Sequence, residues 1–251
     1  ADTLVALTGA DREAVVPEES RRLEPGASHR LGAGTTLVVG SARVGARAYL
    51  ALGGGFGVPE VLGSASTDPV AGFGGVDGRA LQAGDVLRAR RSAALSERQW
   101  PRDVPSSGLS DGRGPTVVAV TGGPHLDAFP HAVEEALAER VWTVAQQADR
   151  LGIRLDGFPV KGVDAIDLVS LPMIPGAVQV PPSGQPIVLM PDAPTVGGYP
   201  VPAVVAAADR YRLGQLRPGD GLSFRWTSVE DARHRLVEQR ERLAAVARSL
   251  S

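Results

Sequence analysis

Hydrophobic positions in this chain of 251 residues come mostly in short runs that end at glycine, proline or charged residues. The runs at residues 116–120 (TVVAV) and 185–190 (QPIVLM) have the length of a buried strand and are short for a helix. Glycine (31 residues) and proline (20 residues) supply turns between the runs, whereas aromatic residues make up only 4%. This pattern predicts a mainly β (α+β) fold of many short strands.

A repeated phrase, L-x-x-G-x-x-L, occurs at residues 31–37, 81–87 and 216–222. We expect its glycine to adopt positive φ, the Asp that follows it in two copies to bond the turn backbone, and the leucines to face a core. Each copy predicts a turn that leads into a strand. Three such turns favour two related barrel-like lobes, and the alternative is that Gly-Asp turns simply recur in β proteins.

Three segments carry a helical pattern. Apolar residues four positions apart predict a short helix at 130–137, and Pro202 suits the first position of a helix over AVVAAADR, residues 203–210. Ser228 and Asp231 resemble a capping box at the start of an amphipathic C-terminal helix. That helix either packs on its own lobe, which we favour, or binds a partner protein.

The stretch before the TVVAV strand loses all periodicity and gathers Ser, Pro, Gly and charged residues, as an exposed connection does. We therefore expect a first β-barrel lobe over 1–95, a linker over 96–115, a second lobe over 116–228 and a C-terminal amphipathic helix over 229–251.

Composition narrows the class of protein. The formal net charge of -2 provides no basic field for a phosphate backbone, which argues against nucleic acid as a partner. No apolar run reaches the length of a membrane span, so no membrane association is expected. The chain has no cysteine, which excludes disulfides and thiolate chemistry, and it begins without a secretory leader pattern. We expect a cytoplasmic protein.

Several cofactor motifs are not met. The single lysine, Lys161, precedes Gly162 without an upstream glycine run, so a P-loop is excluded, and its context does not suit biotin attachment. The glycines at 53–57 fail the dinucleotide spacing because position 58 is valine and Pro59 would interrupt the helix. No two histidines are four apart, and no metal site is expected.

Residues 192–200 (DAPTVGGYP) follow a strand with more polar and glycine residues than a turn needs. Asp192 and Thr195 can accept and donate hydrogen bonds, and Tyr199 can form a wall. Gly197 and Gly198 allow backbone N–H groups to face a substrate. We predict Asp192, Thr195 and Tyr199 as catalytic and the glycines as substrate-binding, in a loop over a barrel mouth. The alternative is that these residues only cap and pack a turn.

Three further residues are predicted to bind substrate. Arg154 is the candidate anchor for a carboxylate, because a guanidinium binds it in bidentate fashion, and Arg150 is the weaker choice. Gln179 is expected to form the floor together with the QPIVLM strand. His125 lies in a glycine-rich turn where Asp127 could orient it, although a surface histidine that caps a helix is the alternative.

Taken in order, several phrases resemble the biotin-dependent carboxyltransferase family, which includes allophanate hydrolase subunit 2, KipA and the C subunit of 5-oxoprolinase. The matching phrases are GARAYLALGGGFGVPEVLGSASTD, GGVDGRALQAGDVL, GGPHLDAF, ADRLGIRLDG, GAVQVPPSGQPIVLMPDAPTVGGYP and LGQLRPGDGLSF. The resemblance implies tandem cyclophilin-like β-barrel lobes. Family members usually carry a further N-terminal segment, which is expected to lie outside this sequence.

The resemblance also implies an enzyme subunit that works with a sister subunit, of the type of allophanate hydrolase subunit 1, KipI or the B subunit of 5-oxoprolinase. The favoured activity is ATP-dependent opening of 5-oxoproline to glutamate. One alternative is carboxyl transfer from carboxybiotin to urea or a related amide, and another is a KipA-type regulatory binding protein. ATP is then a cofactor of the complex, and biotin takes part only if another chain supplies it.

Overall fold

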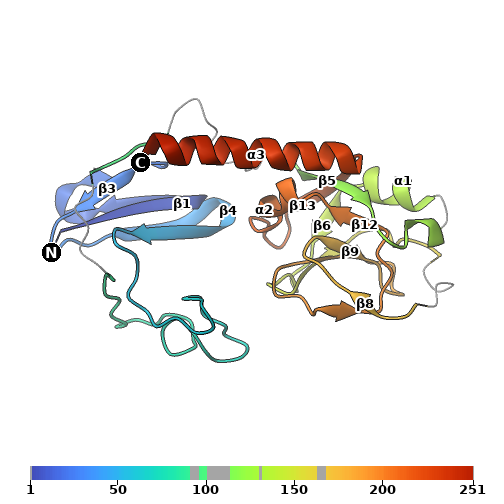
Figure 1. The fold of residues 1–251 in the computed structure, drawn as a ribbon, viewed down its shortest axis with the longest axis horizontal. Helices are drawn as coiled ribbons and strands as arrows, with labels where there is room; N and C mark the ends of the chain where they lie inside the picture. The colour runs from blue at the N-terminus through green and yellow to red at the C-terminus, as the bar shows by residue number, and fades with distance from the viewer. Residues whose placement is uncertain (1, 91–95, 101–113, 130–131, 163–167, 251) are drawn as a thin grey trace. The chain divides into compact units, whose positions relative to one another are not determined.

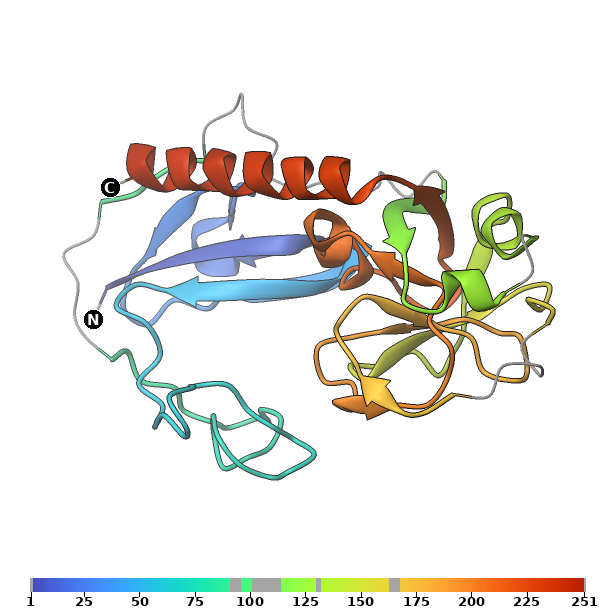
Figure 2. The ribbon, with the colours of Figure 1, turned by 45° about the vertical axis from the view of Figure 1, so that its right-hand side comes forward.

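The computed structural model describes residues 2–90, 96–100, 114–129, 132–162 and 168–250 (Figures 1 and 2). The strands are β1 Thr3–Val16, β2 Arg21–Arg22, β3 Ser28–Leu31, β4 Val38–Leu52, β5 Thr116–Gly122, β6 Trp142–Val144, β7 Gly152–Asp156, β8 Leu171–Pro172, β9 Ala177–Gln179, β10 Ile187–Leu189, β11 Val196–Gly197, β12 Ala203–Val205 and β13 Gly221–Trp226. The helices are η1 Pro17–Glu19, η2 Leu126–Ala128, α1 Ala132–Ala138, η4 Ala207–Asp209, α2 Arg210–Leu213 and α3 Val229–Leu250.

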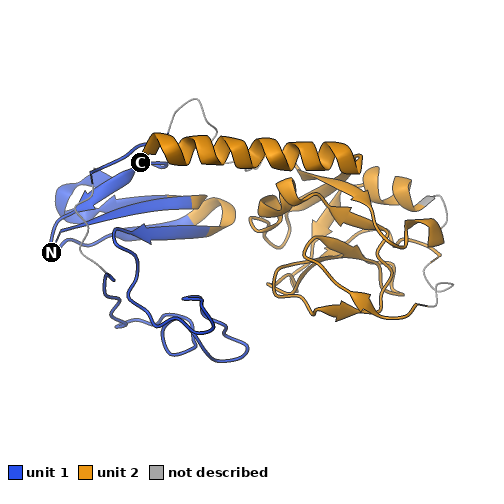
Figure 3. Cartoon of the chain, in the orientation of Figure 1, with its two compact units in different colours: residues 1–8, 13–41, 48–100 blue, residues 9–12, 42–47, 101–251 orange. Residues whose placement is uncertain are grey.

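The chain divides into two compact units (Figure 3). Unit 1 comprises residues 1–8, 13–41 and 48–100, and unit 2 comprises residues 9–12, 42–47 and 101–251. The N-terminal strands form a four-stranded sheet in which β1 pairs with β2, β3 and β4. Its small core gathers Val5, Ala14, Val16, Leu23 and Leu31. The linker predicted at 96–115 lies largely outside the described residues.

Unit 2 contains a closed barrel in the order β10-β7-β6-β13-β5-β12-β9. β13 runs parallel to β5, and the other neighbouring pairs are antiparallel. Because side chains alternate along a strand, every second residue points inward. The inward set fills the barrel with apolar side chains, including Trp142, Leu155, Val178 and Leu222, all fully buried.

The outward residues on one side of the barrel form a second, smaller core. Ala177 of β9 and Leu189 of β10 are buried there with Val201, and Met173 and Ala193 pack against them from two crossing loops. Those loops carry β8 and β11, which pair as a two-stranded sheet. The polar loop at 192–200 is therefore supported by the outer wall of the barrel.

Helix α3 begins as the sequence predicts. The Ser228 hydroxyl accepts a hydrogen bond from the Asp231 N–H at 3.0 Å and donates one to the Asp231 carboxylate at 2.7 Å. Its first half is held on η4 by Arg235, which donates to the Asp209 carboxylate at 2.8 Å, and by Gln239, which donates to the Ala208 carbonyl. The described residues contain no helix with the length and apolar character that a bilayer crossing requires.

The helix predicted over residues 203–210 is wrong in its first half. Residues Ala203–Val205 form β12, which pairs with β5 on one side and with β9 on the other. Ala203 and Val205 point into the barrel core, so two neighbouring strands and burial outweigh the helical preference of an alanine-rich segment. Helical structure begins only at η4. The helix predicted at 130–137 is found as α1.

The L-x-x-G-x-x-L phrase folds largely as predicted. Gly34, Gly84 and Gly219 all have positive φ, between 83° and 94°. Asp85 accepts from the Gln82 N–H at 2.7 Å, and Asp220 accepts from the Arg217 N–H at 2.8 Å. Two copies lead into strands, β4 and β13, whereas in the middle copy Leu81 is 59% exposed and no strand follows in the described residues. The predicted mainly β fold, with a barrel, few helices and a C-terminal helix, is confirmed.

Candidate functional site

The loop at 192–200 is open to solvent and anchored at both ends. Its first residue, Asp192, donates its backbone N–H to the Arg150 carbonyl at 3.1 Å, and at its far end the Pro200 carbonyl accepts from the Val180 N–H at 2.9 Å. Between them, the Thr195 carbonyl accepts from the Met173 N–H at 2.8 Å, where β11 pairs with β8. The loop backbone is thus fixed, while the side chains of Asp192, Thr195 and Tyr199 remain exposed.

Asp192 is paired with a cation. Nε of Arg150 lies 2.6 Å from an Asp192 carboxylate oxygen, and both side chains are partly exposed. From the sequence, Arg150 is a weaker candidate than Arg154 for binding a substrate carboxylate. In the structure, Arg150 forms an ion pair with Asp192 of the protein itself. Because this ion pair is close to solvent, it contributes little stability and serves mainly to orient Asp192.

Gln179 lies under the glycines of the loop. Its side chain is 7% exposed, and its amide nitrogen donates a weak hydrogen bond to the Met173 sulfur at 3.5 Å. A methyl group added at Gly197 would lie 2.5 Å from that nitrogen and 3.1 Å from Met173 Cγ. A side chain at position 197 would therefore displace the end of the Gln179 side chain, and glycine leaves this amide in place. Gly198 has more room, since its nearest neighbour is the Ser170 hydroxyl at 3.3 Å.

Arg154 and Gln179 stand on the same outer face of the barrel. Ile187 of β10 is in register with Gln179 of β9 on one side and with Arg154 of β7 on the other. Adjacent strands are about 5 Å apart, so the two polar residues are separated by about 10 Å with Ile187 between them. Arg154 is exposed, and among the described residues its guanidinium has no hydrogen-bond or ion-pair partner.

His125 is tied to the strand that follows the loop. Its Nδ1 accepts a hydrogen bond from the Val201 N–H at 3.0 Å, and its own backbone N–H donates to the Val201 carbonyl at 3.2 Å. An accepting Nδ1 requires the neutral imidazole with its proton on Nε2. His125 thus fixes the end of the loop, and its Nε2–H is the group left to donate to a ligand.

The structure brings most of the predicted residues into one region of the outer wall. Gln179 and Gly197 are in contact, and Arg154 lies one strand beyond Ile187. Asp192, Thr195, Gly198 and Tyr199 belong to the loop at 192–200, which covers this part of the wall. Tyr199 is 46% exposed, as a wall residue would be. His125 is hydrogen-bonded to Val201, the residue directly after the loop.

Sequence reasoning missed Ile187 and Met173. Ile187 belongs to the apolar run QPIVLM, which predicts a buried strand but does not indicate which of its residues face outward; the structure places Ile187 on the outer face, opposite Val188. Met173 is one of only two methionines and supplies the sulfur that holds the Gln179 amide. No local signal reveals this contact, because it forms between segments that meet only in the folded chain.

Comparison with known proteins places this geometry in a family. The model of the carboxyltransferase domain, subdomain A and B, matches residues 1–226. The C subunit of 5-oxoprolinase from Escherichia coli is 37% identical over 231 residues, which cover 92% of this chain and 72% of that protein. The urea amidolyase of Lachancea kluyveri is 32% identical over 92% of this chain and 14% of its own length.

A solved structure supports the same assignment. The urea carboxylase of Kluyveromyces lactis superposes with a TM-score of 0.81 at 28% identity, over 98% of this chain and 23% of that one. The family predicted from the sequence phrases is therefore confirmed. This chain belongs to the family of biotin-dependent carboxyltransferase domains with subdomains A and B.

Proposed function

We propose that this chain is the substrate-binding subunit of an enzyme complex that opens the lactam of 5-oxoproline to give glutamate at the expense of ATP. The relatives named as the C subunit of 5-oxoprolinase support this, as the E. coli protein matches over 92% of the chain. In this reaction, water is added across the lactam C–N bond, so the carbonyl carbon becomes a carboxylate and the nitrogen an ammonium group. ATP hydrolysis supplies the driving force, and the site is completed by a sister subunit.

The observation that carries the proposal is the row Gln179, Ile187 and Arg154 across three neighbouring strands. 5-Oxoproline is a five-membered ring with a lactam C=O and N–H, two methylene groups, and a carboxylate on the carbon next to the nitrogen. A carboxamide matches the lactam because it both donates and accepts, an aliphatic side chain matches the methylenes, and a guanidinium matches the carboxylate. The three side chains thus offer one partner for each of the three groups.

In this arrangement the covering loop acts on the lactam. The Gly198 N–H is the loop amide that we assign to polarise the lactam carbonyl, because the Gly197 N–H belongs to the pairing of β11 with β8. Asp192, oriented by Arg150, and the Thr195 hydroxyl guide the attacking water, and Tyr199 limits access of bulk water. The catalytic roles of the loop residues belong to this proposal, as does the role of ATP.

A second candidate is carboxyl transfer from carboxybiotin, carried by another chain, to urea or a similar amide. The likeness to the K. lactis urea carboxylase over 98% of this chain favours it. Arg154 would then bind the transferred carboxylate, and Gln179 the amide of the acceptor. Lactam opening and carboxyl transfer would use the same residues of this chain. They differ in the other reactant, which is ATP and water for lactam opening and carboxybiotin for carboxyl transfer.

The test is ATP hydrolysis by the complex of this chain with its sister subunit, with and without 5-oxoproline. Replacement of Arg154 by Gln removes a charge-assisted hydrogen bond, which is worth about 1.5–3 kcal/mol, so KM for 5-oxoproline should rise by about tenfold to a hundredfold. Arg225→Gln is the matched control, since Arg225 is another exposed arginine on a barrel strand. Equal KM values for the two variants would remove Arg154 from the site.

A parallel assay separates the two candidates. Stimulation of ATP hydrolysis by 5-oxoproline alone supports lactam opening. Stimulation by urea only when a biotinylated carrier protein and a biotin carboxylase are present supports carboxyl transfer instead.

A further inference from the structure

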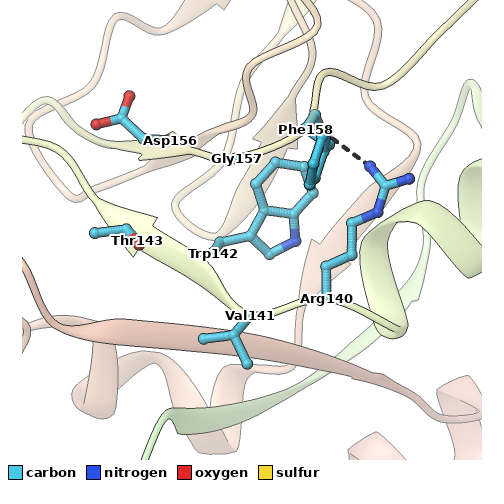
Figure 4. A pocket seen from close by; sticks show the side chains of 7 residues that line it. All are labelled: Arg140, Val141, Trp142, Thr143, Asp156, Gly157 and Phe158. Atoms are coloured by element: carbon cyan, nitrogen blue, oxygen red, sulfur yellow. Dashed lines mark hydrogen bonds between the residues drawn. The ribbon is translucent and has the colours of Figure 1, made fainter.

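The barrel has a hollow at the end of its β6–β7 pair, away from the loop at 192–200. It measures ≈ 470 Å³ and is lined by Arg140, Val141, Trp142, Thr143, Asp156, Gly157 and Phe158 (Figure 4). The two strands pair at Thr143 with Asp156 and at Val144 with Leu155, and the lining residues 140–142 and 157–158 lie beyond these pairs. A hollow of this size suits a small organic molecule.

One end of the hollow is aromatic and rigid. The Phe158 ring is 77% exposed, yet its backbone is fixed, because Arg140 Nη1 donates to the Phe158 carbonyl at 3.0 Å. The Arg140 guanidinium also lies 5.7 Å from the centre of the Phe158 ring. Val141, at 59% exposure, adds a second apolar surface. An exposed aromatic side chain held in place offers binding area at little entropic cost.

The neighbouring glycine adds to this rigidity. The Gln185 carboxamide binds both polar groups of Gly157, accepting from its N–H at 3.1 Å and donating to its carbonyl at 2.8 Å. A methyl group at Gly157 would lie 2.8 Å from the Trp142 ring. Position 157 is therefore packed tightly against the indole, and the edge of the hollow is preformed.

The other end is acidic. Asp156 and Thr143 project from paired strands on the side of the hollow away from Arg140 (Figure 4). Among the described residues, the Asp156 carboxylate has no hydrogen-bond or ion-pair partner, and Arg154, two residues earlier on the same face, forms no ion pair with it. Arg140 is directed at Phe158 at the opposite end, so the charge at this end of the hollow is the negative charge of Asp156.

We infer that this hollow is a second binding site, next to Arg154 but with a lining of its own, for a small organic amine with an apolar body. The body lies against Phe158 and Val141, and the ammonium group lies between the Asp156 carboxylate and the Thr143 hydroxyl. This site requires no turnover and no partner chain, so its test is independent of the proposed function.

Three probes with the same benzene ring test the charge preference: phenethylamine, 2-phenylethanol and 3-phenylpropionate. The reporter is the indole N–H resonance of Trp142 in the full chain labelled with ¹⁵N-tryptophan. Trp226, whose indole donates to the Glu134 carbonyl instead, serves as the internal reference. We expect phenethylamine to shift the Trp142 signal saturably and to bind about threefold to tenfold more tightly than the alcohol, with the carboxylate weakest.

Two variants test which residues of the hollow contact the amine and its apolar body. Asp156→Asn should bring the affinities for the amine and the alcohol together, and Phe158→Ala should weaken both. Glu230→Gln, which removes an exposed acid on α3, should leave the preference unchanged. Equal affinities of the three probes for the wild-type chain, or a preference for the amine that survives in Asp156→Asn, would overturn the inference.

Discussion

Gly197→Ala is the sharpest perturbation of the candidate site, because its neighbour Gly198 offers a control one residue away. Neither glycine has a positive φ, so alanine fits the backbone at both positions and gains the same entropic benefit of about 0.4–1 kcal/mol. The new methyl group at 197 lies 2.5 Å from the Gln179 amide nitrogen, about 1 Å inside ordinary contact. At 198 it lies 3.3 Å from the exposed Ser170 hydroxyl, which can rotate away.

The difference in stability between Gly197→Ala and Gly198→Ala therefore measures the cost of the contact with Gln179. Overpacking of this kind costs about 1–3 kcal/mol, because the buried amide can move only by leaving Met173. Each kcal/mol lowers Tm by about 2–4 °C in a chain of this size. If the amide binds the lactam, its displacement also costs one hydrogen bond, and KM for 5-oxoproline should rise by about twofold to tenfold in Gly197→Ala alone.

The measurements are thermal unfolding of each single-site variant by circular dichroism and 5-oxoproline-dependent ATP hydrolysis by the assembled complex. Equal Tm values for Gly197→Ala and Gly198→Ala would refute the packing argument. A lower Tm for Gly197→Ala with an unchanged KM would support the packing argument but would show that Gln179 does not bind the substrate.

Two other predictions follow from buried or paired carboxylates. Asp209→Ala leaves the Ala119 N–H and Arg235 without their acceptor, so the free energy of unfolding in urea should fall by about 3 kcal/mol, and Asp209→Asn, which keeps one acceptor oxygen, should lose less. The bond to Arg79 lowers the pKa of Asp85 from 3.8 to about 2, so the stability from this pair is complete above pH 3.8 and is lost as the pH falls toward 2. An NMR titration of the Asp85 carboxyl group checks this, and Arg79→Gln should return its pKa toward 3.8; an unchanged low pKa in that variant would contradict the assignment.

The sequence predicted features that depend on neighbouring residues along the chain. The positive φ of Gly84 and Gly219, the hydrogen bonds of Asp85 and Asp220 within their turns, and the Ser228 cap all follow from short-range chemistry. The β12 strand was missed because its strand character comes from pairing with β5 and β9, segments distant in sequence. The row of Gln179, Ile187 and Arg154 depends on strand register across three segments and was out of reach for the same reason.

The position of Gln179 also explains why residue 197 of the loop at 192–200 is glycine. A strand residue on the outer wall of a barrel is normally exposed or covered by apolar side chains. The Gln179 carboxamide, at 7% exposure, instead lies under the loop and donates one weak hydrogen bond to the Met173 sulfur. Gly197 leaves just enough room for that amide, so the fold retains a buried polar group that an alanine-containing loop would exclude. In the proposed function, an amide of the ligand bonds to this carboxamide more strongly than the Met173 sulfur does. The weakly bonded carboxamide is then what makes the proposed site selective for an amide or lactam.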